Sequence, residues 1–91
     1  MIYIIEFSEI AQTDIAYLKR SEPKAYRKLL KLLQELQEHP TTGTGHPKPL
    51  GDNRTGQWSR RITQKHRLIY QIEDDEIMVL VLSTYGHYND K

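Results

Sequence analysis

Residues 56–83 read GQWSRRITQKHRLIYQIEDDEIMVLVLS, and they decide the predicted fold of this 91-residue chain. From Trp58 onward the side chains alternate between two sets, which is the period of a β-strand with two different faces. Two short polar turns divide the stretch into three strand-like runs, residues 58–63, 67–72 and 77–82. Three consecutive strands joined by short turns predict an antiparallel meander.

The N-terminal half predicts one more strand and two helices. Residues 2–7 are rich in β-branched and aromatic side chains with little alternation, which predicts a strand buried on both faces and central in its sheet. Ser8 is a candidate N-cap for a helix over about residues 9–20, and Ser21 is a candidate N-cap for a second helix ending near Pro40. Leucines at helical spacing in the second helix predict a core face rather than a groove for a partner.

Together these elements predict an α+β fold in a single domain over residues 1–91. An N-terminal strand, an α-helical hairpin and the three-stranded antiparallel meander would form one four-stranded sheet, with the hairpin on one face. The first strand joins this sheet because it has no other place to bury its apolar side chains.

Composition and motifs exclude several classes of protein. The chain has no cysteine, which excludes a disulfide scaffold and a thiolate metal site. Its longest apolar runs are far too short to cross a bilayer, and no signal peptide is visible, so we expect a cytoplasmic protein. No phosphate-binding glycine loop, HExxH pair or nucleophile elbow occurs, and the four histidines lack metal-ligand spacing. We therefore expect neither a metal nor a cofactor.

The net charge of +1 conceals a polarised chain. Residues 46–67 carry six Lys or Arg against one Asp, whereas residues 68–91 carry five acidic residues against one Lys. A concentrated positive segment predicts an anionic partner, most often phosphate. The alternative is an ordinary solvated surface.

The basic meander and the C-terminal segment hold the candidate chemical groups. Alternation places Arg61 opposite the apolar face, and Arg67 joins it only if the register across the turn allows. Arginines bind phosphate oxygens, and Arg and Tyr side chains, such as Tyr85 and Tyr88, stack on unpaired bases. A histidine such as His87 can exchange a proton near neutral pH. These groups suit metal-free RNA cleavage by 2′-OH attack on the adjacent phosphate, although residues near a chain end often fray without function.

Four blocks of sequence give the chain a family resemblance. They are residues 45–50 (GHPKPL), 56–63 (GQWSRRIT), 66–70 (HRLIY) and 86–88 (GHY). Over nearly the whole chain they resemble the YoeB/Txe toxins of bacterial type II toxin–antitoxin systems, within the RelE/ParE superfamily. The resemblance implies a RelE-like microbial RNase fold and an mRNA endoribonuclease that acts in the ribosomal A site and inhibits translation. It also implies a cognate antitoxin that holds the toxin inactive, and it suggests a homodimer.

The same resemblance implies roles for individual residues. The family's catalytic arginine falls on Arg67, its general-acid histidine on His87 and its assisting tyrosine on Tyr88. Arg61 matches a basic residue placed near the RNA backbone. The side chains expected to bind RNA are Arg60, Arg61, Lys65 and His46.

One position departs from the family pattern. Family members often carry glutamate as the general base in this loop (GKPEPL), where this chain has Lys48. Lys48 could act as a neutral base, it could stabilise charge while another group takes the proton, or the chain could be a weak or inactive relative. We favour the second account, because related RelE-type toxins work with a largely cationic site. His46 is then a candidate substitute base.

Two other classes of function stay open at this point. A non-catalytic superfamily member could bind DNA gyrase, as ParE-type toxins do. Alternatively, the chain could bind only RNA or its antitoxin.

Overall fold

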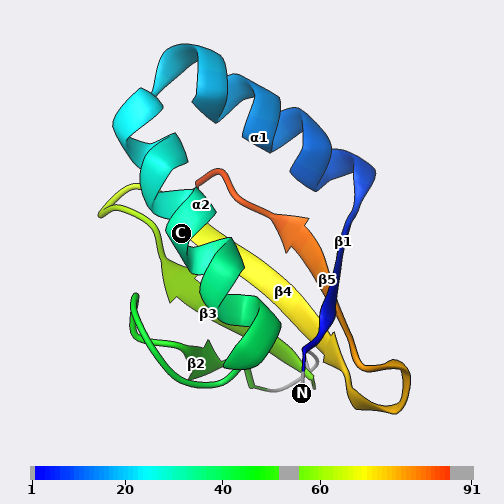
Figure 1. The fold of residues 1–91 in the computed structure, drawn as a ribbon. Helices are drawn as coiled ribbons and strands as arrows, with labels where there is room; N and C mark the ends of the chain where they lie inside the picture. The colour runs from blue at the N-terminus through cyan, green and yellow to red at the C-terminus, as the bar shows by residue number, and fades with distance from the viewer. Residues whose placement is uncertain (1, 52–55, 87–91) are drawn as a thin grey trace.

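The computed structural model describes residues 2–51 and 56–86, and its helices and strands follow the predicted order (Figure 1). The elements are β1 (Ile4–Phe7), α1 (Glu9–Ser21), α2 (Pro23–Glu38), β2 (Lys48–Pro49), β3 (Gln57–Arg61), β4 (Arg67–Glu73), the 3-10 turn η1 (Asp74–Glu76) and β5 (Met78–Ser83). The predicted α+β class, with a helical hairpin followed by an antiparallel meander, is confirmed.

The sheet has five strands in the order β1-β5-β4-β3-β2, rather than the four predicted. The additional strand is β2, whose Lys48 and Pro49 pair with Ser59 and Trp58 of β3. A strand of two residues, one of them a proline, carries no readable alternation, so the sequence gives no signal for it. β1 runs parallel to β5, and every other neighbouring pair is antiparallel.

The prediction that the N-terminal strand is central was wrong, because β1 lies at the edge of the sheet. It pairs with β5, and its side chains alternate between exposed and half-buried, with Ile4 60% exposed. A run of β-branched residues favours a strand, but its position in the sheet depends on the neighbouring strands.

Ser8 links the start of α1 to the sheet. Its Oγ accepts a hydrogen bond from the N–H of Ala11 at 3.0 Å, as predicted for an N-cap, and donates one to the carbonyl of Leu82 at 2.8 Å. Ser21 is the last residue of α1 rather than a cap, and Glu22 forms the junction between the two helices. This junction places the side chain of Glu22 beside the end of the sheet.

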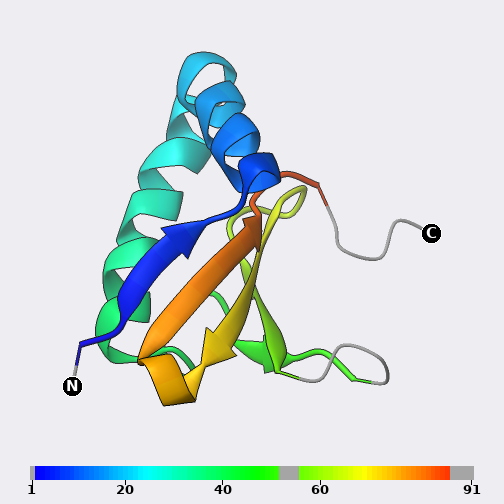
Figure 2. The same ribbon diagram turned by 90° about the vertical axis from the view of Figure 1, so that its right-hand side faces the viewer.

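The two helices cover one face of the sheet, and the other face carries no helix (Figure 2). The core lies between these layers, and the prediction of a core face on α2 is confirmed for Leu29, Leu32 and Leu36. It was wrong for Leu30, which is 42% exposed. The fully buried apolar members of the core include Leu18, Leu29, Leu32, Leu36, Leu68, Tyr70, Val79 and Val81. Within residues 2–51 and 56–86, no helix has the length and apolar character needed to cross a membrane.

Candidate functional site

The sheet face without helices brings together cations from three strands. Arg61, at the end of β3, pairs directly with Arg67, at the start of β4. Lys48 of β2 pairs with Ser59, two residues before Arg61 on β3. Directly opposed residues, and residues two apart on a strand, point to the same face. The register therefore places Lys48, Arg61 and Arg67 on one face, which we call the cationic face.

Arg67 is held in place through one end of its guanidinium group. Its Nη1 donates hydrogen bonds to the carbonyls of Thr63 at 2.8 Å, Gln64 at 3.3 Å and His66 at 3.3 Å. Within the described part of the chain, its Nε and Nη2 have no hydrogen-bond partner. An arginine anchored on one side and open on the other can offer its remaining N–H groups to phosphate oxygens.

The C-terminal segment is fastened beside Arg67 through Gly86. The carbonyl of Gly86 accepts a hydrogen bond from the N–H of Arg67 at 2.9 Å, and its N–H donates one to Nδ1 of His66 at 2.8 Å. Its φ of +75° lies in the left-handed region that favours glycine. The residues that follow, His87 and Tyr88, lie outside the described residues, so their assigned roles stay predictions.

Tyr85, just before this anchor, packs against two other rings. Its ring lies 4.7 Å from that of His66 and 5.0 Å from that of Tyr17. The hydrogen bond with the Tyr17 side chain, together with the negative charges of Glu22 and Asp14, raises the pKa of Tyr85 above its ordinary value of 10.0. Tyr85 therefore stays a neutral phenol at cellular pH.

The loop that carries His46 and Lys48 is attached to β3 by backbone hydrogen bonds. The carbonyl of Gly45 accepts from the N–H of Arg61 at 2.7 Å, and the N–H of Leu50 donates to the carbonyl of Gln57 at 2.9 Å. A Cβ at position 45 would lie 2.8 Å from the carbonyl oxygen of Arg61, so this close approach requires glycine. His46 and Lys48 are both exposed, which leaves their side chains accessible to a ligand on this side.

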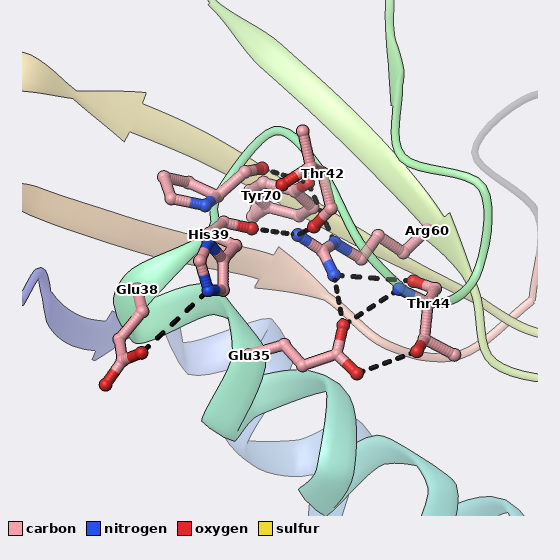
Figure 3. A network of polar contacts seen from close by, with 8 residues as sticks. Glu35, Glu38, His39, Thr42, Thr44, Arg60 and Tyr70 are labelled. Atoms are coloured by element: carbon pink, nitrogen blue, oxygen red, sulfur yellow. Dashed lines mark hydrogen bonds and ion pairs between the residues drawn. The ribbon is translucent and has the colours of Figure 1, made fainter.

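Arg60 does not belong to the cationic face, and the expectation that it binds RNA is wrong. Its side chain is 0% exposed and forms an ion pair with Glu35, with 3.0 Å between Nη1 and Oε1 (Figure 3). Its Nε donates to the hydroxyl of Tyr70 at 3.2 Å. Further hydrogen bonds run from the guanidinium group to the carbonyls of His39, Thr42 at 2.7 Å and Thr44 at 3.3 Å. Alternation already places Arg60 on the same face as Trp58 and Ile62, which is the core face.

Glu35 is a structural residue that the sequence reasoning missed. Its carboxylate accepts hydrogen bonds from the hydroxyl of Thr44 at 2.7 Å and from the N–H of Thr44 at 2.8 Å. These hydrogen bonds, with the adjacent guanidinium of Arg60, lower the pKa of Glu35 below its ordinary value of 4.5. The charged pair therefore fastens the loop over residues 39–44 to α2 and to β3.

His66 is the second missed residue, because the sequence assigned it only to a turn. Its side chain is 1% exposed, and its Nε2 lies 3.1 Å from both carboxylate oxygens of Glu22. Neighbouring Lys65 is exposed in the turn, and its contact with phosphate stays a prediction. Over residues 2–51 and 56–86, no cluster of three or more His, Asp or Glu side chains could hold a metal ion.

Comparisons with known proteins agree with this architecture. The family model described as "YoeB-like toxin of bacterial type II toxin-antitoxin system" matches residues 7–88. Toxin YoeB of Escherichia coli K12 is 36% identical over 73 residues, which is 80% of this chain and 87% of that protein. The structure of the YoeB dimer from Staphylococcus aureus is similar, with a TM-score of 0.84 and 32% identity over 97% of this chain and 100% of that one. The heterotetrameric YoeB–YefM toxin–antitoxin complex from the same organism gives a TM-score of 0.82 at the same identity and coverage.

Proposed function

This chain belongs to the YoeB-like toxins of bacterial type II toxin–antitoxin systems, and we propose that it is a ribosome-dependent mRNA endoribonuclease. The observation that carries this proposal is the pairing of Arg61 with Arg67 on the helix-free face, with Gly86 bound directly beside Arg67. The proposed action is cleavage of mRNA in the ribosomal A site, which stops translation.

The proposed reaction needs no metal ion. The 2′-oxygen of a nucleotide attacks its own 3′-phosphate, so that a bond from O2′ to phosphorus forms while the bond from phosphorus to O5′ breaks. The N–H groups at Nε and Nη2 of Arg67 stabilise the charge that develops on the phosphate oxygens. His87 protonates the departing 5′-oxygen, and Tyr88 assists. The products are a 2′,3′-cyclic phosphate and a 5′-hydroxyl.

Lys48 replaces the family's glutamate, and we propose that it acts as a cation. It is exposed on β2, where a solvated ammonium can approach the phosphate from the edge of the cationic face. A different group must then accept the proton of the 2′-OH. His46, two residues earlier and also exposed, is the candidate.

Side chains around this reaction centre bind the RNA. Arg61, Lys65 and His46 are exposed and can contact phosphates upstream and downstream of the cleaved bond. Arg60 does not take part in RNA binding, because its guanidinium group is buried against Glu35.

The partners follow from the family. The related S. aureus toxin occurs in a complex with the antitoxin YefM, and this chain likewise has a cognate antitoxin that neutralises it. A homodimer is expected as well, because the S. aureus toxin YoeB has a known dimer structure. We expect the toxin in the cytoplasm, where ribosomes translate mRNA.

The alternative is a non-catalytic toxin that binds DNA gyrase, RNA or only its antitoxin. Induction of the free protein in bacteria separates these functions. The proposal predicts growth arrest with cleaved mRNA and unchanged plasmid supercoiling. Growth arrest with altered supercoiling and intact mRNA would support the gyrase alternative, and normal growth would leave only a binding role.

A further inference from the structure

His66 lies between two parts of the fold that are far apart in sequence. On one side, its Nε2 is 3.1 Å from both oxygens of Glu22, at the junction between α1 and α2. On the other side, its Nδ1 is 2.8 Å from the backbone nitrogen of Gly86, near the C-terminus. The imidazole is 1% exposed, so water does not compete for either nitrogen.

The contact with Gly86 fixes the protonation state of the ring. A backbone N–H can only donate, so Nδ1 must be the nitrogen that accepts and carries no proton. The single ring proton is then on Nε2, which faces the carboxylate of Glu22. His66 is therefore a neutral imidazole that donates to Glu22 and accepts from Gly86, rather than the cation of an ion pair.

We propose that His66 is a positioning residue, whose neutral ring fixes Gly86 and thereby sets where the C-terminal segment begins relative to Arg67. Gly86 is held twice, because its carbonyl accepts from the N–H of Arg67 while its N–H donates to His66. The carboxylate of Glu22 accepts a hydrogen bond from Nε2 and so favours the tautomer with the proton on Nε2. In histidines generally, the hydrogen bond made by one ring nitrogen sets which nitrogen is protonated.

The consequence for catalysis rests on the proposed function. The next residue after Gly86 is His87, the proposed general acid, and consecutive Cα atoms are only about 3.8 Å apart. Loss of one of the two anchors on Gly86 would widen the range of positions open to His87. Misplacement of a catalytic group by about 1 Å can cost about 100-fold in rate.

Two amide substitutions separate the two ring contacts. In His66→Asn the side-chain oxygen can take the place of Nδ1 and accept from Gly86, but the side chain is too short for Glu22. In His66→Gln the longer amide reaches Glu22 and leaves the N–H of Gly86 without an acceptor. Both variants replace a buried ring with a smaller amide, so a general loss of packing affects them alike.

The test combines two measurements on the free toxin with one on ribosomes. In the wild type, the 15N NMR signals of the ring should be those of a neutral imidazole protonated on Nε2. The amide of Gly86 should exchange hydrogen slowly in the wild type and in His66→Asn, and faster in His66→Gln. In mRNA cleavage on ribosomes, His66→Gln should lose about 10- to 100-fold in kcat with little change in KM, whereas His66→Asn should keep most of the activity.

Each opposite result would overturn the assignment. A charged ring, or a neutral ring protonated on Nδ1, would contradict the proposed hydrogen bonds, and this measurement needs only the wild-type protein. Equal Gly86 exchange and equal cleavage in the two variants would mean that His66 only fills space. If the wild type cleaves no mRNA, the proposed function fails, while the ring signals and Gly86 exchange still decide whether His66 is the anchor.

Discussion

Arg61 and Arg67 lie directly opposite each other across β3 and β4. The preceding and following residues, Arg60 and Leu68, are buried under the helices, so Arg61 and Arg67 lie on the face that carries no helix. Like charges in directly opposed positions destabilise a sheet, whereas opposite charges would stabilise it. The chain therefore carries an unfavourable pair at the point where the C-terminal segment is attached. A local conflict of this kind is typical of a functional site, and a phosphate bound between the two guanidinium groups would relieve it.

Replacement of Arg61 by glutamine should separate binding from stability. We expect Arg61→Gln to leave the free energy of unfolding unchanged or to raise it by up to about 0.5 kcal/mol, because the repulsion is removed. Affinity for ribosome-bound mRNA should fall. In a plot of log affinity against log salt concentration, the slope should become less negative by about one. Arg27→Gln, the same change at an exposed position of α2, is the matched control and should preserve the wild-type salt dependence. Equal salt dependence in Arg61→Gln would argue against RNA binding at the cationic face.

The adjacent residues Arg60 and Arg61 should differ sharply in their effect on stability. Arg60→Met removes the buried partner of Glu35 and the donor to three loop carbonyls, and should lower the free energy of unfolding by about 3–5 kcal/mol. Arg61→Met changes an exposed side chain and should stay within about 0.5 kcal/mol. Urea unfolding of both variants measures the difference. Similar losses of stability in the two variants would mean that the contacts of Arg60 with Glu35 and the loop carbonyls do not hold the 39–44 loop.

Glu35 should make the protein sensitive to acid. Its pKa is lowered in the folded state by the hydrogen bonds from Thr44 and by Arg60, against an ordinary value of 4.5 in the unfolded chain. The charged carboxylate of Glu35 therefore contributes its full stabilisation above pH 4.5. This stabilisation is lost as the pH falls from 4.5 through the lower pKa of the folded protein, because the unfolded chain takes up the proton first. Glu35→Gln should be less stable than the wild type at pH 7, with a smaller further loss between pH 7 and acid pH. Thermal unfolding as a function of pH checks this, and parallel curves for the two proteins would contradict it.

Lys48 tests whether the site works with a cation in place of the family's carboxylate. If Lys48 stabilises charge, Lys48→Arg should keep much of the cleavage activity and Lys48→Ala should lose it. A guanidinium group does not lose its proton in proteins, so an active Lys48→Arg variant could not use this side chain as a base. Lys48→Glu, which restores the common family residue, should be no better than the wild type.

Two results would contradict this role for Lys48. A Lys48→Arg protein that binds ribosomes but does not cleave would mean that the lysine acts as a base. A rise in cleavage with Lys48→Glu would mean that the site is built for a carboxylate and that this chain is impaired.

Alternation in the sequence predicted two strands of the meander correctly, and it also indicates on which face of the sheet each arginine lies. The first two strands of the meander were predicted from a period of two, and the third was predicted from a short apolar run that follows a turn. The same period places Arg60 with Trp58 and Ile62 on the core face, yet its charge led to the wrong expectation that it binds RNA. The compensating carboxylate, Glu35, lies 25 positions away on a helix, and a single sequence gives no sign of such a pairing.

Other features depend on contacts that local patterns do not contain. The edge position of β1 depends on which strand it pairs with, and β2 is too short to have a period. His66 looks like a turn residue until the fold brings Glu22 and Gly86 to its two ring nitrogens. The roles of Arg67, His87, Tyr88 and Lys48 came from family resemblance, because no spacing in the sequence assigns a general acid or a base.

The most direct test of the central claim is to map mRNA ends on purified ribosomes with the wild type and His87→Ala. The account predicts ribosome-dependent cuts in the A-site codon, with 5′-hydroxyl ends, for the wild type. Loss of the general acid should slow cleavage by about 100-fold or more in His87→Ala, while antitoxin binding and thermal unfolding stay unchanged. His39→Ala removes a histidine whose side chain is 62% exposed and should cut like the wild type. Unchanged cleavage by His87→Ala, or no ribosome-dependent cleavage by the wild type, would contradict the account.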